Sequence, residues 1–176
     1  MLTRRLLLTG AMAWSSSAWA QEPAAPQSPI LTVDSQRLFT GSAFGQRVAS
    51  EIEARGAALA QENQRIAAEL AAEERDLTER RSTLPSDEFR ALADAYDEKV
   101  QATRRAQLTK SDELDAYAAA QERTFLTAAA PVLEALMREA GALIVLEKDR
   151  TLLSATAIEV TDIAIARIDA AIGDGT

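Results

Sequence analysis

Acidic side chains are the groups in this chain most able to do chemistry, and they gather at two places along it. Glu73 and Glu74 are adjacent, and Asp94, Asp97 and Glu98 follow further along. Such carboxylates could bind a divalent cation or serve as a general acid and base. Both clusters fall in segments with a helical pattern and many other charges, where solvated helix surface is the simpler interpretation. We therefore expect no metal site.

The residue types that the chain lacks restrict enzymatic chemistry further. It contains no His and no Cys, which removes the commonest general base, the commonest soft metal ligand and the thiol nucleophile. A catalytic site would have to use carboxylates, Lys, Tyr or Ser alone. We therefore predict that the protein is not an enzyme, and the sequence indicates no cofactor.

The first twenty residues match the pattern of a cleavable signal peptide. Arg4 and Arg5 form a basic start, an apolar stretch covers residues 6–14, and Ala18-Trp19-Ala20, with small residues at its first and third positions, is typical of a cleavage site. The apolar stretch is too short to span a bilayer. The paired arginines also resemble a twin-arginine signal, so that export route stays open beside the general secretory route, which we favour. Both routes predict a periplasmic protein.

The rest of the chain is acidic. Removal of residues 1–20 would leave 156 of the 176 residues, with 17 Lys and Arg against 27 Asp and Glu, a net charge of −10. This charge argues against nucleic acid as a partner and makes binding to anionic lipid doubtful. Residues 21–29 hold three of the five prolines, which predicts a disordered linker.

Residues 43–139 have the pattern of two long helices joined by a tight turn. Apolar residues of the first half repeat every seven positions in two series, Ile52, Leu59 and Ile66, then Leu70, Leu77 and Leu84. A period of 3.5 residues indicates a left-handed coiled coil. Gly56 and Asn63 interrupt the pattern, so we expect a loosely packed, bendable hairpin.

Residues 82–86 are the predicted tip of this hairpin. Pro85 disfavours helix before it, and Ser42 and Ser86 are expected to cap the first and second helix. A short connection of this kind joins antiparallel helices. At 1.5 Å per residue the first helix would be roughly 60 Å long, far beyond the radius of so small a domain. The hairpin must therefore project into solvent.

Residues 30–42 and 140–176 are predicted to form a small β-rich body. Strands are expected at 30–33, 143–146 and 152–154, where apolar and β-branched residues gather. Three short strands and one short helix bury too little surface to be stable alone. We therefore predict self-association through apolar residues of this body. The candidates are Ile30, Val33, Leu38, Phe39, Leu143, Ile144, Val145, Leu146 and Leu152.

Several single residues in the body have an expected structural role. Asp34 follows the first strand and is expected to act as a helix cap, with Arg37 pairing with it or with an acidic neighbour. Gly141 and Gly173 are expected to end the second long helix and the last helix, and Thr161 to cap the last helix. The predicted fold is thus α+β and mainly α, a long antiparallel coiled-coil hairpin projecting from a small β-rich oligomerisation body.

Three segments resemble the Skp/OmpH family of periplasmic chaperones. Residues 30–39 (ILTVDSQRLF) are similar to the family's opening strand and its Val-Asp/Asn…Leu-Phe motif. Residues 141–146 (GALIVL) follow the helices, and residues 159–161 (EVT) stand where the family commonly has Asp-Val/Ile-Thr. The resemblance extends from residue 30 to about residue 172.

The resemblance implies a homotrimer whose three helical arms enclose a cavity and hold unfolded outer-membrane proteins without ATP. The best-known members are basic and are thought to meet lipid through Lys and Arg clusters. This chain departs from them in its acidic charge, so the lipid-binding positions are not transferred to it.

Apolar residues of the hairpin are the candidates for contacts with such clients. They are Leu59, Ile66, Leu70, Leu77, Leu84, Phe89, Leu92 and Tyr96. The structural alternative is that most of them only form the contact between the two helices. A different function also stays open, that of a periplasmic coiled-coil spacer or adaptor of the cell envelope.

Overall fold

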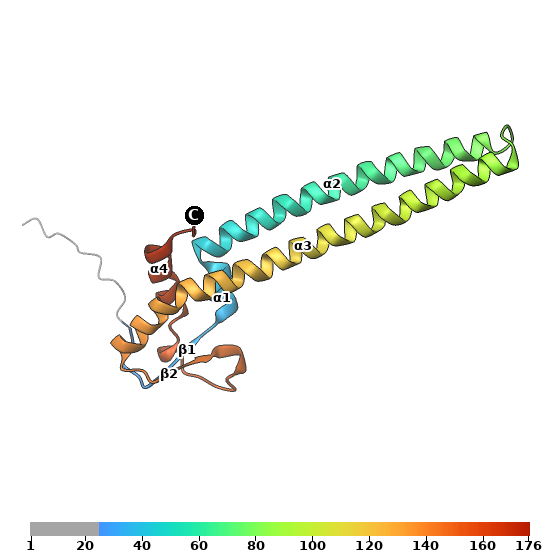
Figure 1. The fold of residues 1–176 in the computed structure, drawn as a ribbon. Helices are drawn as coiled ribbons and strands as arrows, with labels where there is room; N and C mark the ends of the chain where they lie inside the picture. The colour runs from blue at the N-terminus through green and yellow to red at the C-terminus, as the bar shows by residue number, and fades with distance from the viewer. Residues whose placement is uncertain (1–24) are drawn as a thin grey trace, which may run out of the picture.

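The computed structural model of the protein describes residues 25–176. The predicted signal peptide at 1–20 and the first four residues of the predicted linker lie outside these described residues. Two long antiparallel helices form an arm that stands clear of a small body, which holds the two strands and the last helix (Figure 1). The predicted fold class, mainly α with a projecting helical hairpin, is confirmed.

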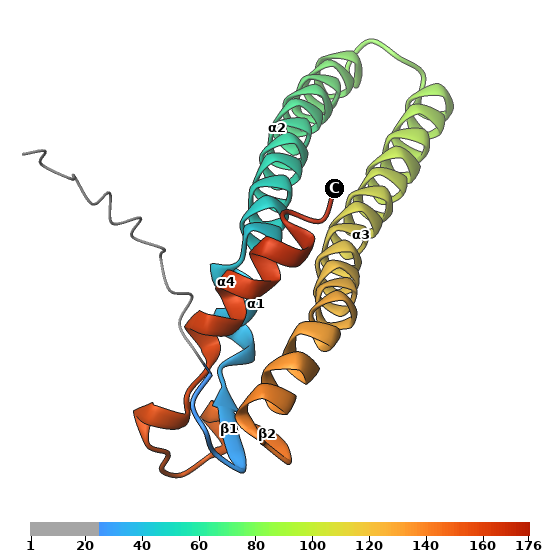
Figure 2. The same cartoon turned by 90° about the vertical axis from the view of Figure 1, so that its left-hand side faces the viewer.

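The arm consists of α2 (Ala43–Arg80) and α3 (Ser86–Ala140). These helices have 38 and 55 residues, so their lengths are roughly 57 and 83 Å at 1.5 Å per residue. Ser42 caps α2 as expected, since its side chain accepts a hydrogen bond from the Gly45 N–H. Residues 81–85 make the turn between the helices. The antiparallel arrangement is visible in both views (Figures 1 and 2).

The body surrounds a two-stranded sheet of β1 (Ile30–Val33) and β2 (Ile144–Glu147). The strands are parallel, with Leu31 opposite Val145. The short helix α1 (Ser35–Gly41) follows β1, and α4 (Thr161–Ile172) ends the described chain. Between β2 and α4 lie two 3₁₀ turns, η1 (Lys148–Arg150) and η2 (Thr156–Ile158).

The main core lies where the arm joins the body. Phe125 of α3 is fully buried between Phe39 and Phe44, with ring centroids 5.2 and 5.6 Å away. Leu38 of α1 and Ile168 of α4 complete this core. We call this cluster the root of the arm. Residues of four helices meet in this cluster. The inner parts of α2 and α3 therefore supply much of the hydrophobic core of the body.

A second, smaller core lies under the sheet. Leu31 of β1, Ala140 at the end of α3 and Val160 before α4 are all buried in it. Gly141 ends α3 in the left-handed conformation, with φ of 64°. A residue with a Cβ rarely adopts this conformation, so the expected C-terminal cap is confirmed here.

The third predicted strand is wrong. Residues 152–154 lie in the loop between η1 and η2, and Leu152 and Leu153 are 96% and 89% exposed. β1 has instead a single bridge to Glu159, supported by a hydrogen bond from the Val160 N–H to the Thr32 carbonyl at 3.0 Å. A β-prone segment forms a strand only beside a partner, and this loop has none in the described chain. The middle strand also begins one residue later than predicted.

Two expected helix caps are wrong. Pro85 and Val160 hold the N-cap positions of α3 and α4, and neither makes a side-chain cap. Ser86 and Thr161 are instead the first residues of these helices. The Thr161 hydroxyl is buried and accepts a hydrogen bond from the Asp34 N–H at 3.0 Å, so the body's packing determines its role.

The predicted disordered linker is wrong over residues 25–29. The Ser28 N–H donates to the Ala140 carbonyl at 3.1 Å, and the Pro29 carbonyl accepts from the Leu143 N–H at 2.9 Å. Gln27 also donates to the Glu139 carbonyl. The proline-rich composition could not indicate these hydrogen bonds, because their partners lie at and just after the end of α3, far away in the sequence.

We predict that truncation of Phe125 destabilises the protein far more than truncation of an aromatic residue at the tip. Phe125→Ala is expected to cost about 3–5 kcal/mol in the free energy of unfolding, because it leaves a cavity between two other rings. Phe89→Ala, at a half-buried position, is the matched control and should cost clearly less. Denaturant unfolding followed by circular dichroism measures both, and equal losses would contradict the assignment of the main core to the root.

Candidate functional site

The eight candidate client-binding residues lie along the contact between α2 and α3. All of them, Leu59, Ile66, Leu70, Leu77, Leu84, Phe89, Leu92 and Tyr96, are half-buried. On α2 the half-buried positions recur every three or four residues, which is the spacing of one helix face. We call this face-to-face contact the seam. The structure thus brings the candidates together, but as packing partners of one another more than as a free surface.

Polar contacts also cross the seam. Lys110 forms an ion pair with Glu62 at 2.6 Å, and Lys99 pairs with Glu73. The Tyr96 hydroxyl donates to the Leu70 carbonyl at 3.3 Å. The Lys110 ammonium lowers the pKa of the Glu62 carboxyl, and Glu73 raises the pKa of Lys99. These pairs fix the register of the two helices, although surface ion pairs of this kind each stabilise the fold only weakly.

A denser polar cluster, which we call the collar, joins the two helices just outside the root. Arg47 pairs with Glu51 at 2.6 Å, and Glu51 accepts a hydrogen bond from the Tyr117 hydroxyl. The Arg55 guanidinium lies 3.9 Å from the centre of the Tyr117 ring, in cation–π geometry. The hydrogen bond from Tyr117, then that from Arg47, lowers the pKa of Glu51. Arg47 also donates to the Asp174 carbonyl at 2.6 Å, which ties the end of the chain to the arm.

Two large apolar side chains on the arm are exposed. Leu108 and Leu126 of α3 are 61% and 43% exposed. They are eighteen residues apart, which is five turns of helix, so both lie on one face of α3. These two leucines do not follow the seven-residue apolar pattern of the arm, so the pattern did not indicate them as binding candidates. Their positions outside the seven-residue pattern were the one feature of the sequence that could have indicated exposed leucines on the arm.

The body carries more of the exposed large apolar side chains than the arm does, and we call this set of residues the open face. It consists of Ile30, Leu143, Ile144, Leu152 and Leu153, which are between 42% and 96% exposed. Ile30, Leu143 and Ile144 lie at the starts of the two strands, and Leu152 and Leu153 lie in the loop that follows η1. Large exposed apolar side chains are typical of interaction sites. Nothing in the described residues pairs as a strand with the outer edge of β2, so its backbone groups are also available there.

The predicted oligomerisation residues divide into two sets. Ile30, Leu143, Ile144 and Leu152 belong to the open face. Val33, Leu38 and Phe39 pack instead in the main core of the chain itself, and Val145 and Leu146 are half-buried. The apolar pattern identified all of them as buried, but it could not distinguish burial within one chain from burial between chains.

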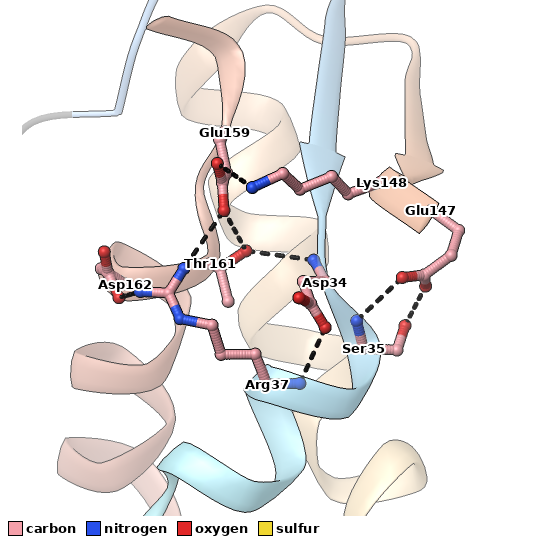
Figure 3. A network of polar contacts seen from close by, with 8 residues as sticks. All are labelled: Asp34, Ser35, Arg37, Glu147, Lys148, Glu159, Thr161 and Asp162. Atoms are coloured by element: carbon pink, nitrogen blue, oxygen red, sulfur yellow. Dashed lines mark hydrogen bonds and ion pairs between the residues drawn. The ribbon is translucent and has the colours of Figure 1, made fainter. Parts of the chain in front are cut away.

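A network of polar contacts ties together the ends of β1, β2 and the turn before α4 (Figure 3). Glu159 accepts from Arg37 at 3.2 Å and from Lys148 at 2.7 Å. Arg37 also pairs with Asp162, which raises the pKa of the guanidinium. Asp34 accepts from the Arg37 N–H at 2.8 Å and so caps α1, as expected from the sequence.

A second branch of this network joins β2 to the start of α1. Glu147, the last residue of β2, accepts a hydrogen bond from the Ser35 N–H at 3.0 Å and one from the Ser35 hydroxyl. Each partner in the network satisfies another group of the body. The arrangement therefore positions the sheet and the neighbouring turns, and no substrate is needed to explain it.

The acidic pairs considered for catalysis lie on the arm. Glu73 pairs with Lys99 across the seam, and Glu74, Asp94, Asp97 and Glu98 are exposed on the helix surfaces. Within residues 25–176, no group of three or more acidic side chains is placed to hold a metal ion. In the same range, no helix is both long and apolar enough to cross a bilayer.

The fold and these surfaces define a class of protein in which a long helical hairpin projects from a small α/β body with an exposed apolar face. The family model described as Outer membrane protein (OmpH-like) matches residues 29–168. The chain therefore belongs to the OmpH-like family, and the resemblance inferred from its sequence is confirmed.

One solved structure has the same fold over almost the whole chain. It is a protein of Caulobacter crescentus CB15 described as a candidate outer membrane chaperone (OmpH-like). The two chains are 20% identical, with a TM-score of 0.74, and the match covers 97% of this chain and 95% of the other. No curated protein matches this chain in sequence.

We predict that acid destabilises the arm. The pKa values of Glu51 and Glu62 are lower in the folded chain than their ordinary value of 4.5. Their contribution to stability is therefore present above about pH 4.5 and is lost as the pH falls through the lowered pKa values. The pKa of Lys99 is raised above 10.5, so its contribution is present below that pH and is lost as the pH rises further.

Thermal unfolding followed by circular dichroism across this pH range measures the effect. Glu62→Gln should reduce the acid-induced loss of stability, whereas Glu53→Gln, at an exposed position of the same helix, serves as the control. The same acid dependence in the wild type and Glu62→Gln would contradict the assignment.

Proposed function

We propose that this chain is an ATP-independent holdase chaperone of the periplasm, which binds unfolded outer-membrane proteins between helical arms and prevents their aggregation. The observation that carries the proposal is the projecting arm of α2 and α3 on a body of the OmpH-like family (Figure 1). The similar structure described as a candidate outer membrane chaperone supports it. An arm of this kind offers a long surface and no enclosed catalytic cleft, which suits binding without chemistry.

Holding an unfolded chain requires many weak contacts and no strong one. Several contacts along an arm, and several arms around one client, keep the client at a high effective concentration while each contact exchanges freely. No bound nucleotide is needed for such a mechanism. The exposed residues Leu108 and Leu126, together with the half-buried tip residues Leu84 and Phe89, are the contacts that we propose for clients.

We further propose that the arms work together in a homotrimer. The open face supports self-association, because it exposes five large apolar side chains and because the outer edge of β2 pairs with no strand of the described residues. A second copy would remove these side chains from water and pair the backbone of the strand. The number three comes from the family resemblance. Copies joined through their bodies would carry their arms side by side and leave a space between them.

The spacer or adaptor function is the second candidate, and one observation favours it. Leu108 and Leu126 are the exposed large apolar residues of the arm among the described residues, and most of the other candidates lie in the seam. A rigid spacer does not need a large exposed apolar surface on its arm, so this small exposed area is compatible with that function. Aggregation assays distinguish the two functions, because a spacer does not keep an unfolded client soluble.

We predict that polar substitutions on the arm weaken client holding. A denatured outer-membrane protein that contains Trp is diluted into buffer with the chaperone, and light scattering reports aggregation. The two tryptophans of this chain, Trp14 and Trp19, lie in the predicted signal, so Trp fluorescence reports the client alone. Leu84→Ser/Phe89→Ser and Leu108→Ser/Leu126→Ser should each raise the amount of chaperone needed for full suppression. Ala106→Ser, on exposed α3 surface, is the control.

Failure to suppress aggregation in the wild type would reject the holdase function. Suppression that neither double variant weakens would reject only the proposed contact residues.

We predict that the open face mediates self-association. Light scattering coupled to gel filtration should give three times the mass of one mature chain for the wild type. Leu152→Ser/Leu153→Ser should shift the mass toward that of a monomer, because it removes the two most exposed side chains of the open face. Leu108→Ser/Leu126→Ser makes the same chemical change on the arm and should leave the mass unchanged. A monomeric wild type would contradict the proposal.

A further inference from the structure

A groove lies at the tip of the arm, where the turn between the long helices meets the start of α3. Its volume is about 360 Å³, which is at the lower end of the range for ligand sites. The residues that line it, which we call the tip groove, are Arg81, Leu84, Ser86, Phe89, Arg90 and Ala93. The tip is the part of the arm farthest from the body (Figure 1), so the body does not obstruct access to this groove.

Hydrogen bonds within the turn hold the tip groove in shape. The Thr83 and Leu84 N–H groups both donate to the Arg80 carbonyl, at 3.0 and 3.1 Å. The Phe89 N–H donates to the Pro85 carbonyl at 3.0 Å. Leu84 and Phe89 are therefore held on the two sides of the turn, where both are half-buried and form an apolar floor. A site that is already formed does not have to be ordered by its ligand, which favours binding.

The charge of the tip groove is opposite to that of the chain as a whole. Both charged residues that line it are arginines, although acidic residues outnumber basic ones in the sequence. Other grooves on the arm, beside Glu62 and beside Asp97, contain carboxylates. The tip groove is thus a place on the arm where an anionic group meets cations without an acidic side chain in the lining.

The two arginines are available to a carboxylate. The Arg81 guanidinium lies 5.8 Å from the centre of the Phe89 ring, and no carboxylate within residues 25–176 pairs with it. Contact with the ring face orients the guanidinium and leaves its N–H groups free for a bidentate bond to a carboxylate. Arg90 pairs with Asp87 at 3.7 Å, and these side chains are 74% and 96% exposed. So long and solvated a pair is weak, and an incoming carboxylate can replace it.

We propose that the tip groove binds segments of an unfolded polypeptide in which an acidic residue stands next to a large apolar one. The carboxylate accepts hydrogen bonds from Arg81 or Arg90, and the apolar side chain packs on Leu84 and Phe89. The proposal rests on the chaperone function proposed above, since it names the kind of client segment that the arm recognises.

A polypeptide fits this groove better than an anionic membrane does. A membrane surface would also meet Asp87 and Glu88, which are exposed at the start of α3 and repel it. A single carboxylate in a flexible chain can approach the arginines alone. The chain continues beyond the groove on both sides, so it can make further weak contacts along the arm.

Three dye-labelled peptides test the proposal on the full mature protein, with fluorescence anisotropy as the measurement. They share flanks of Gly and Ser and differ only in the central pair, which is Glu-Phe, Lys-Phe or Glu-Ser. The wild type should bind the Glu-Phe peptide roughly tenfold more tightly than either other peptide, because each of those lacks one of the two contacts. Equal binding of the Glu-Phe and Lys-Phe peptides would overturn the proposal.

Substitution of the two arginines tests whether the tip groove is the site. Arg81→Gln/Arg90→Gln should weaken binding of the Glu-Phe peptide roughly tenfold and should not weaken binding of the Lys-Phe peptide. Arg81→Lys/Arg90→Lys keeps the charge but removes the planar pair of donors, so it should restore only part of the loss. Circular dichroism verifies that the variants keep their helices.

Arg104→Gln/Arg105→Gln is the matched control, because it makes the same change in net charge at exposed positions of α3 outside the groove. It should leave binding of the Glu-Phe peptide unchanged. A loss as large as that of Arg81→Gln/Arg90→Gln would show that overall charge, and not the groove, attracts the peptide.

Failure of this proposal is distinguishable from failure of the chaperone function. If the wild type suppresses client aggregation but does not prefer the Glu-Phe peptide, only the assignment of the tip groove is wrong. Sedimentation with phosphatidylglycerol vesicles tests the other occupant. Vesicle binding that depends on Arg81 and Arg90, without any preference among the peptides, would assign the groove to lipid and overturn the proposal.

Discussion

The burial of Phe125 between Phe39 and Phe44 is the contact on which the rest of this structure depends. These rings come from α3, α1 and α2, so one cluster fixes the two halves of the arm against the body. The strands alone could not do this, because two strands of four residues bury little surface. Both the direction of the arm and the stability of the body therefore follow from this root.

Outside the root, the arm is held by many small contributions. Its backbone hydrogen bonds are made within each helix, so the arm does not need a body around it. The seam adds half-buried apolar side chains and a few ion pairs, each of which contributes little. Such a structure is stable enough to project and weak enough to deform locally. An arm that binds an unfolded partner by weak contacts would need both properties.

The body differs from the arm, since it has a well-packed interior but also exposes large apolar side chains. Its polar network satisfies Glu147 and Glu159 and positions the sheet. Beside this network, Leu152 and Leu153 are exposed in a loop where the sequence predicts a strand. The prediction rested on β propensity, which describes the fit of a residue to a paired, half-buried surface. The described chain offers no partner strand there, so the propensity alone does not produce a strand.

Sequence patterns were enough to predict the long helical hairpin, its turn near Pro85, the caps at Asp34, Ser42 and Gly141, and the OmpH-like family. These features depend on local periodicity and on residues that act on their immediate neighbours. Which apolar residues are exposed became clear only from the packing of the folded chain. Leu38 and Phe39 are packed in the root while Leu152 and Leu153 lie open to solvent, although all four are apolar and lie in the predicted body. Burial depends on which distant segments meet, and a local pattern does not contain that information.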